Sequence, residues 1–359
     1  MKLTKPERDK GYTRTFYSYP AKFQAKLPRG LIERFTTEGD LVLDPFVGGG
    51  TTGLEAMLLD RRFLGYDINP FAILVSSVKT TYLDSNILKA YLVTILSQVS
   101  ETIDPKCDIL DYEDKVCLGS SISNEINSIF AMISTISKEL SFKQFFELAL
   151  IHSIKIVGRR DFEIKNKNIS IIPIFERKAS KMIREISSLP RSPKFTPVFK
   201  LASNQYMEQE NDSVDLIVTS PPYKDKDIEY QKVQIQRRSL RKSKRSDVIS
   251  NILKINPLSK IELCWTGRSG RNYWENSLKS LKECYRLLKP LKYAFFWLGF
   301  KNTSDIQTFE LQLTKVGFQV LKSIRVRLSD DRAASGRSTH HGKSTGMMSH
   351  DYLFAVGKE

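Results

Sequence analysis

A glycine-rich turn directly after a short apolar run is the feature that most constrains this fold. Residues 41–44 read Leu-Val-Leu-Asp, which predicts a buried parallel strand. Residues 45–52 read Pro-Phe-Val-Gly-Gly-Gly-Thr-Thr, and a helix is expected from about Thr52 to Asp60. Glycine lets the backbone turn tightly and approach a ligand, and a helix N-terminus adds free N–H groups. With a further strand at residues 63–67, this predicts a right-handed strand–helix–strand unit around a binding turn.

A proline-rich turn follows a second predicted strand, at residues 215–219. The turn, residues 220–223, reads Ser-Pro-Pro-Tyr. Two prolines fix φ, so the Pro221 carbonyl and the Ser220 hydroxyl become rigid hydrogen-bond acceptors. The Tyr223 ring can stack on a planar group. This combination suits the binding of a planar amine, and the candidate catalytic residues are Ser220, Pro221, Pro222 and Tyr223.

The remaining pattern predicts an α/β fold with a doubly wound, mostly parallel sheet and a helical insertion. Strands are expected at residues 199–202 and 293–298, and a final antiparallel pair at 318–328 and 352–356. Residues 224–250 are polar and basic and are interpreted as a loop. Helices are expected at residues 122–140, 142–157, 178–189 and 277–288. The expected organisation is a core of residues 1–83 and 198–359, with a mostly helical insertion at 84–197.

Charge indicates a polyanionic partner, since the formal net charge is +16. Each phosphate neutralised by a basic side chain releases condensed counterions. A basic protein without such a partner is the alternative. The cysteines are scattered and form no CxxC pair, so neither a disulfide framework nor a metal site is expected. No apolar run could span a bilayer and no signal core opens the chain, so a cytoplasmic location is expected.

The first of these turns resembles the cofactor-binding sequence of the DNA amino-methyltransferases, which modify N4 of cytosine or N6 of adenine. The resemblance lies in Asp-Pro-Phe-x-Gly-x-Gly-Thr-Thr at residues 44–52 and Gly-x-Asp-x-Asn-Pro at 65–70. It implies S-adenosylmethionine as cofactor and a seven-stranded Rossmann-like sheet. Asp67 ends the second strand, where an acid suits two ribose hydroxyls. Residues 19–23 resemble the element that closes over the methionine end. The candidate cofactor residues are Lys22, Phe23, Asp44, Pro45, Phe46, Gly48, Gly50, Thr51, Thr52, Asp67 and Asn69.

An adenine-contacting acid, which the resembling family often carries after the third strand, is not settled by the sequence. Asn204 and Asp212 are both candidates. The resemblance as a whole covers roughly residues 12–80 and 198–359.

The reaction implied is methyl transfer to the N4 amino group of cytosine in DNA, since Ser-Pro-Pro is typical of N4-cytosine enzymes in this family. Asp-Pro-Pro or Asn-Pro-Pro is typical of N6-adenine enzymes. The expected mechanism is direct in-line displacement, because no cysteine follows a proline as a C5-cytosine enzyme would require. N6-adenine methylation, RNA amino-methylation and an inactive DNA-binding subunit remain alternatives. The resemblance suggests a restriction–modification or phage-defence setting, with a restriction endonuclease or defence proteins as possible partners.

Access to a paired amino group requires flipping the base out of double-stranded DNA. Basic side chains should meanwhile hold the phosphates. The helical insertion and the basic segment at residues 224–275 compete for the role of target recognition. The candidate DNA-binding residues are Arg237, Arg238, Arg241, Lys242, Lys244, Arg245, Arg268 and Arg271.

Overall fold

A computed structural model describes most of the chain. The described residues are 11–17, 19, 24–99, 108–158, 170–224, 233–237, 242–254, 271–300, 302–326 and 350–359.

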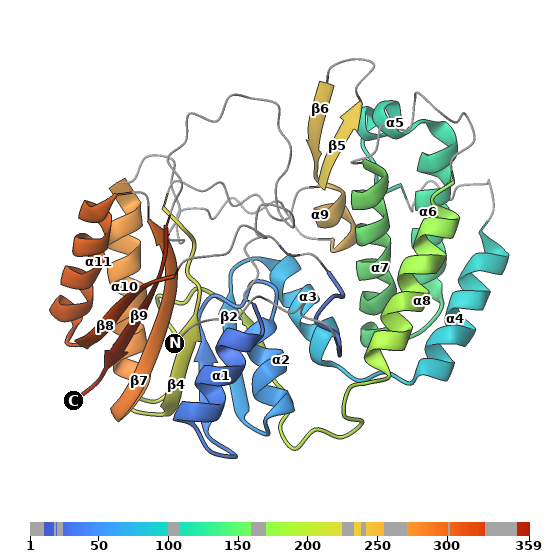
Figure 1. Ribbon diagram of the computed structural model, residues 1–359. Coiled ribbons are helices and arrows are strands. Elements are labelled where there is room, and N and C mark those ends of the chain that lie inside the picture. The colour runs from blue at the N-terminus through green and yellow to red at the C-terminus, as the bar shows by residue number, and fades with distance from the viewer. Residues whose placement is uncertain are drawn as a thin grey trace.

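A seven-stranded sheet forms the centre of the molecule, in the order β3-β2-β1-β4-β7-β9-β8 (Figure 1). The strands from β3 to β7 in this order are parallel, and β9 runs antiparallel to both of its neighbours. The predicted Rossmann-like, doubly wound sheet is therefore confirmed. The strands are β1 (Leu41–Asp44), β2 (Arg62–Asp67), β3 (Val198–Leu201), β4 (Val214–Thr219), β7 (Leu288–Phe300), β8 (Gln319–Val326) and β9 (His350–Gly357).

Strands β1 and β4 are direct neighbours, with Val42 opposite Leu216 and Leu43 opposite Ile217. Because both strands run the same way, their carboxyl ends lie at one edge of the sheet. This carboxyl edge is uppermost in Figure 1. The glycine turn (residues 45–50) and the proline turn (residues 220–223) therefore both begin at that edge.

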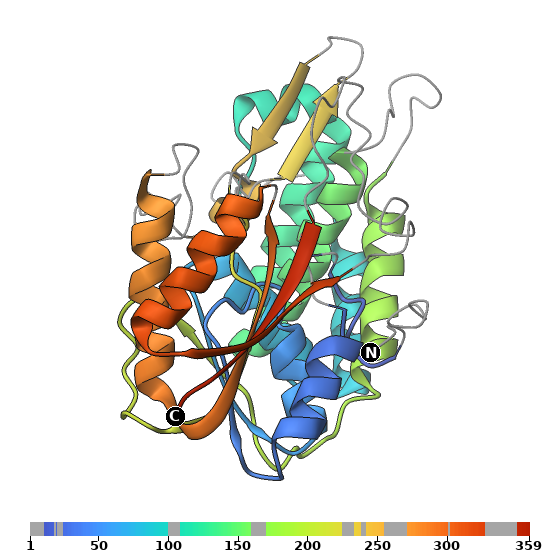
Figure 2. The same cartoon turned by 60° about the vertical axis from the view of Figure 1, so that its left-hand side comes forward.

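Helices cover both faces of the sheet (Figure 2). Alternate residues of a strand point to opposite faces, so Val42 and Leu216 pack with α1 and α2, whereas Leu43 and Ile217 pack with α10 and α11. The helix α3 begins where the Asn69 side chain accepts a hydrogen bond from the Phe71 N–H at 3.0 Å, with Pro70 at the first helical position. These helices are α1 (Lys26–Phe35), α2 (Thr51–Leu58), α3 (Pro70–Thr80), α10 (Arg271–Leu287) and α11 (Thr303–Val316).

A group of helices, here called the helical lobe, lies between α3 and β3 in the chain. Apolar residues recur along this part of the chain at helical spacing, so that each helix has a face to bury. Phe145, Phe146 and Phe175 are fully buried at the centre of the lobe. Figure 1 shows the lobe beside the sheet. Its helices are α4 (Ser85–Gln98), α5 (Tyr112–Leu118), α6 (Ser120–Thr135), α7 (Leu140–Gly158) and α8 (Ile172–Ile186).

The segment made of residues 11–17 and 19, here called the N-terminal strap, joins the sheet core to the helical lobe. Arg14 forms a bidentate ion pair with the buried Glu55 of α2, with both N–O distances 2.7 Å. On the other side, the Phe16 carbonyl accepts a hydrogen bond from Lys178 Nζ at 2.5 Å and lies 3.3 Å from His152 Nδ1. The strap is thus held from both sides.

The prediction of a loop at residues 224–250 is wrong in part. Strands β5 (Val233–Arg237) and β6 (Lys242–Ser246) form an antiparallel hairpin, and the helix α9 (Val248–Ile252) follows. The hairpin is anchored to the helical lobe, because Ser246 Oγ donates to Asp114 Oδ2 at 2.7 Å and α9 packs into the lobe's core. In the sequence, Val233 and Ile235 alternate with glutamines, a strand signal that the high charge obscured.

Other element boundaries also differ from the sequence expectations. The strand β7 begins at Leu288, so Pro290 lies within it rather than beyond the end of a helix. The helix α11 was not predicted, although Ile306, Phe309 and Leu313 recur at helical spacing. No helix in the described ranges is long and apolar enough to span a bilayer.

Candidate functional site at the carboxyl edge

The glycine turn is closed by backbone hydrogen bonds. The Val47 N–H donates to the Tyr66 carbonyl of β2 at 3.1 Å, and the Gly50 N–H donates to the Val47 carbonyl at 2.9 Å. Gly50 has a φ of 67°, and a Cβ there would lie only 2.5 Å from the Ser76 Cβ of α3. Only glycine fits this position, because both the backbone conformation and the contact with α3 exclude a side chain.

Asp44 connects the two turns. Its Oδ1 accepts hydrogen bonds from the Phe46 N–H at 3.0 Å and from the Thr219 hydroxyl at 2.6 Å, and its Oδ2 accepts one from the Thr52 hydroxyl at 2.7 Å. Thr219 is the last residue of β4, immediately before the proline turn. Burial raises the pKa of Asp44 to about 6, despite these three hydrogen bonds, which lower it. A single carboxylate therefore fixes the glycine turn to the end of β4, where the proline turn begins.

Asp67 closes the other side of the glycine turn. Its Oδ2 accepts from the Gly48 N–H and its Oδ1 from the Asn69 N–H, both at 2.9 Å. Burial raises the pKa of Asp67 to about 6. A carboxylate has about four lone-pair positions, and the Ile68 N–H also acts on this one, so Asp67 retains acceptor capacity for a ligand hydroxyl group.

Tyr19 of the N-terminal strap covers the glycine turn. A Cβ added at Gly49 would lie 3.0 Å from the Tyr19 Cβ, and the Tyr19 hydroxyl accepts a hydrogen bond from Asn69 Nδ2 at 3.2 Å. The fully buried Lys79 donates from below to the Gly49 carbonyl. The turn is thus enclosed by side chains from the strap and from α3.

The site fits the cofactor that the sequence resemblance implies. Thr51 Oγ1, in the first turn of α2, is buried and has no hydrogen-bond partner among the described residues. A polar atom buried in this way is costly unless a ligand satisfies it. The Thr51 hydroxyl can therefore donate to a polar ligand at the glycine turn, and the Asp67 carboxylate can accept from one.

The proline turn is held in place by three contacts. The Tyr273 hydroxyl of α10 donates to the Pro222 carbonyl at 3.1 Å. The Tyr223 hydroxyl donates to Asp351 Oδ1 at 3.3 Å, and Lys224 forms a 2.6 Å ion pair with Asp305 of α11. Within the described part of the chain, the Ser220 hydroxyl and the Pro221 carbonyl form no hydrogen bond. Two acceptors are therefore left for a ligand at this turn.

The two candidates for an adenine contact lie at different ends of the sheet. Asp212 precedes β4 at its amino end and pairs with Lys358, so it cannot reach the carboxyl edge. Asn204 follows β3 at the correct edge, but its Nδ2 donates to the Pro45 carbonyl at 2.8 Å and its Oδ1 accepts from Ser280 at 2.6 Å. Asn204 therefore supports the glycine turn from beneath.

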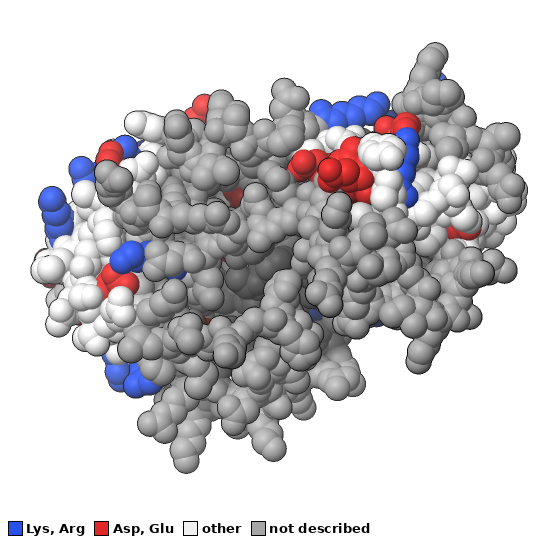
Figure 3. Space-filling view, turned by 90° about the horizontal axis from the view of Figure 1, so that it is seen from above, with Lys and Arg blue, Asp and Glu red and all other residues white. Residues whose placement is uncertain are grey.

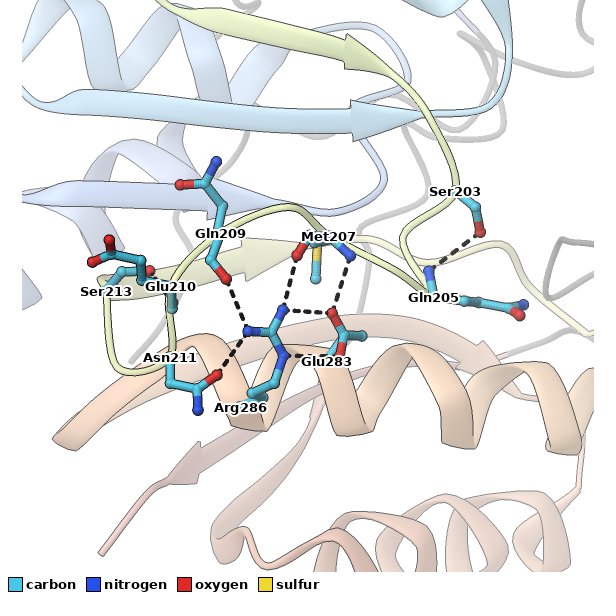
Figure 4. A network of polar contacts seen from close by, with 9 residues as sticks. All are labelled: Ser203, Gln205, Met207, Gln209, Glu210, Asn211, Ser213, Glu283 and Arg286. Atoms are coloured by element: carbon cyan, nitrogen blue, oxygen red, sulfur yellow. Dashed lines mark hydrogen bonds and ion pairs between the residues drawn. The ribbon is translucent and has the colours of Figure 1, made fainter.

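The loop that carries Asn204 is fixed by α10, as Figure 4 shows. Arg286 donates to the Met207 and Gln209 carbonyls, each at 2.8 Å, and pairs with Glu283. Glu283 in turn accepts from the Met207 N–H at 3.0 Å. These contacts hold the loop while it passes from β3 to β4.

Some predicted site residues lie outside the described residues. These are Lys22, Phe23, Arg238, Arg241 and Arg268. For four residues of the hairpin and the first of α10, only the backbone is described, namely Arg237, Lys242, Lys244, Arg245 and Arg271.

Several residues at the site were not found from the sequence. Thr219, Tyr273 and Asp351 contact the site from three different elements, and Lys79 contacts it from α3. Tyr273, Asp351 and Lys79 lie in no local motif, and only the folded sheet brings them to the turns. Thr219 directly precedes the proline turn, but only strand pairing brings it to Asp44. No group of metal-ligating side chains occurs within the described ranges.

The sheet, the glycine turn and the acid at the end of β2 together define a Rossmann-like α/β fold with a candidate cofactor site. Comparisons with known proteins bear on the class of protein that carries it. A family model for N6 and N4 methylation, described as DNA methylase, matches residues 2–77.

Similar curated proteins are type II methyltransferases. M.MjaII of Methanocaldococcus jannaschii is 33% identical over 99 residues, which are 28% of this chain and 18% of that protein. M.PvuII of Proteus hauseri is 34% identical over 89 residues, 24% of this chain and 26% of that protein. M.MvaI of Kocuria varians is 22% identical over 360 residues, 80% of this chain and 76% of that protein. The chain thus spans about a fifth to a quarter of the first two relatives.

A solved S-adenosylmethionine-dependent methyltransferase of Methanosarcina mazei covers 91% of this chain and 96% of its own, at 10% identity and a TM-score of 0.36. That likeness is too distant to bear on the site. The family-model and curated matches support an N4/N6 DNA amino-methyltransferase family for this chain, as the sequence resemblance predicted. They also support S-adenosylmethionine as the cofactor.

Proposed function

We propose that this protein transfers a methyl group from S-adenosylmethionine to N4 of a cytosine flipped out of double-stranded DNA. The observation that carries the proposal is the hydrogen bonding of Asp44, which ties the glycine turn to the strand that ends in the proline turn. The type II relatives support DNA as the substrate and a restriction–modification setting. Ser220 favours cytosine through the resemblance described above.

The proposed roles follow from the free groups at the two turns. Asp67 accepts the ribose hydroxyls, and residues 44–52, Asn69, Lys22 and Phe23 form the rest of the cofactor site. The cofactor supplies a methyl group activated on a sulfonium. The Ser220 hydroxyl and the Pro221 carbonyl accept the two amino hydrogens, which favours the pyramidal nitrogen whose lone pair can attack. Alignment and charge placement then supply the rate, without a covalent intermediate.

We further propose that the helical lobe and the β5–β6 hairpin recognise the target together. The hairpin packs on the lobe through Asp114 and α9, so the two candidate regions form one body at the carboxyl edge. Figure 3 looks down on this edge, and the described acidic and basic side chains that it colours lie toward its two sides. In this proposal residues 1–83 and 198–359 contain the catalytic core, and the hairpin's arginines and lysines grip the phosphates.

Labelled S-adenosylmethionine tests the proposal, with unmethylated duplex DNA and with tRNA as acceptors. Identification of N4-methylcytosine in DNA is the expected result. Identification of N6-methyladenine would instead show an N6-adenine DNA methyltransferase. Label in RNA alone would exclude a DNA methyltransferase. Ser220→Ala should lower kcat by about ten- to a hundredfold, because one acceptor for the amine is lost. The matched control is Ser213→Ala, since Ser213 lies at the amino end of β4.

A further inference from the structure

The position of the Tyr223 ring is set by residues far away in the chain. Its edge lies against Gly299 of β7, where an added Cβ would be 2.5 Å from Tyr223 Cε2. Its hydroxyl donates to Asp351 of β9 at 3.3 Å, across 128 residues of sequence. The ring is therefore placed by two strands of the sheet as well as by its own turn.

Asp351 is built into the sheet at this point. It lies directly opposite Gly299 in the β7–β9 ladder and is only 3% exposed. Its Oδ2 accepts a hydrogen bond from Trp297 Nε1 at 3.2 Å, while its Oδ1 faces Tyr223. One carboxylate thus joins an indole of β7 to the phenol of the proline turn.

The glycine makes room for this arrangement. A Cβ at Gly299 would also lie 3.0 Å from Asp351 Oδ1, so any side chain there would crowd both the carboxylate and the ring. A buried carboxylate needs hydrogen-bond donors, and Trp297 and Tyr223 supply them. The contacts of Tyr223 are thereby coupled to the packing of two central strands.

We propose that Asp351 is a positioning residue that holds the hydroxyl end of the Tyr223 ring, so that the ring is placed to stack on the flipped base. This inference rests on the proposed function and names a residue that the sequence motifs do not include. The Tyr223 hydroxyl lies on the axis of rotation about the Cβ–Cγ bond, so its hydrogen bond to Asp351 fixes where the ring lies, while the contact with Gly299 limits rotation of the ring plane. A stacked aromatic pair depends on the relative orientation of its planes, and misplacement of a group that orients a substrate lowers turnover.

A double-mutant cycle tests the proposal, with methyl transfer to duplex DNA, cofactor binding and thermal unfolding as readouts. Tyr223→Phe and Asp351→Ala should each lower kcat by about tenfold and leave the cofactor Kd within about twofold. The double variant should be no slower than the slower single variant, because both changes remove the same hydrogen bond. Asp351→Asn keeps the side-chain volume and should recover part of the rate.

The matched control is Asp215→Ala, which removes another aspartate that is 3% exposed, at the amino end of β4. Asp215 pairs with Lys289, so its loss lowers stability without reaching the proline turn. Rate losses that multiply in the double variant would overturn the proposal, as would an Asp351→Ala loss no greater than that of the control. If Asp351→Ala does not fold, the Asp351→Asn and Tyr223→Phe pair decides the coupling.

The two proposals fail in different ways. A wild-type protein that transfers no methyl group to DNA removes the proposed function, and with it the role of Asp351. A wild-type protein that is active, with Tyr223 and Asp351 uncoupled in the rate of methyl transfer, removes the role of Asp351 alone.

Discussion

Two aspartates at the ends of neighbouring strands dominate the site at the level of single residues. Asp44 and Asp67 were both predicted as cofactor residues from local motifs, because a carboxylate beside a glycine turn is a recognisable pattern. Their partners were not identifiable in this way. Thr219 lies 175 residues from Asp44, and only strand pairing brings the two together.

Cofactor affinity should depend on pH through Asp67, whose pKa is raised to about 6 by burial. The ionised carboxylate is the better acceptor for ribose hydroxyls, so affinity should be constant above about pH 7 and fall as the pH drops below 6. Well below pH 6, the cofactor affinity should fall by about tenfold for each pH unit. Titration calorimetry from pH 5 to pH 8 measures this directly.

The control for that titration is Asp67→Asn, which should bind the cofactor about tenfold more weakly at pH 8 and show a flat profile. Asp44 has a similarly raised pKa. An Asp67→Asn profile that still falls below pH 6 would therefore assign the dependence to Asp44.

Gly50→Ala should lower the free energy of unfolding by about 2–4 kcal/mol, from its positive φ and the overlap with Ser76. Chemical denaturation measures the change. Gly30→Ala is the matched control, because Gly30 lies in α1 with nothing within 4 Å of an added Cβ. That substitution should raise stability by about 0.5–1 kcal/mol. Equal effects at both positions would contradict the proposed reason for Gly50.

Among the elements, the N-terminal strap connects the glycine turn to the helical lobe. Tyr19 covers the glycine turn, while the Phe16 carbonyl is held by Lys178 of α8. Burial lowers the pKa of Lys178 to about 7, with Lys181 adding to the effect. His152 of α7 faces the same carbonyl, and burial, with Lys178, lowers its pKa to about 3.

Lys178 should make stability rise with pH. Its folded-state pKa of about 7 lies below the ordinary value of 10.5, so between these values the unfolded chain holds a proton that the folded chain has lost. The contribution of Lys178 to stability therefore increases from about pH 7 to pH 10.5. Lys178→Met should flatten this rise in urea titrations at pH 7, 8 and 9. A rise of unchanged slope in the variant would assign it to another group.

The buried parallel strands were predictable because each is a short apolar run beside a turn signal. The strands β1 and β2 match the expected ranges to within one residue. The hairpin was missed because high charge obscured the alternation of Val233 and Ile235 with glutamines, and because its packing against α5 and α7 joins distant parts of the chain. The charged side chains indicated that the segment lies at the surface, but they did not indicate whether its backbone forms a loop or a hairpin. Packing against the helical lobe determines the backbone structure.

For the molecule as a whole, the doubly wound and mostly parallel sheet was predictable from strands that alternate with helices, whereas the pairing of β1 with β4 came from the structure. The sequence could not predict that the hairpin and the helical lobe pack together, because α9 enters the lobe's core more than 130 residues after α5 begins. The sequence also did not indicate which side of the candidate site each basic segment faces.

The basic hairpin should supply part of the salt dependence of DNA binding. Arg241→Glu with Arg245→Glu should weaken binding and reduce the slope of log K against log salt by about 2. The control reverses Arg62, the first residue of β2 at the amino edge, and Arg191, in the connection that leads to β3. Both pairs change the net charge equally, so equal losses of slope would show a general field effect rather than local contacts.

The seam between β1 and β4 divides the sheet into a half that holds the glycine turn and a half that holds the proline turn. Each half is contiguous in space, and no strand of one lies among those of the other. Exchanging the two halves in a gene would therefore preserve every neighbour in the sheet and alter only the loops that link them. Proteins with the opposite order of these two signatures can share this architecture, so motif order alone is a poor guide to kinship or chemistry.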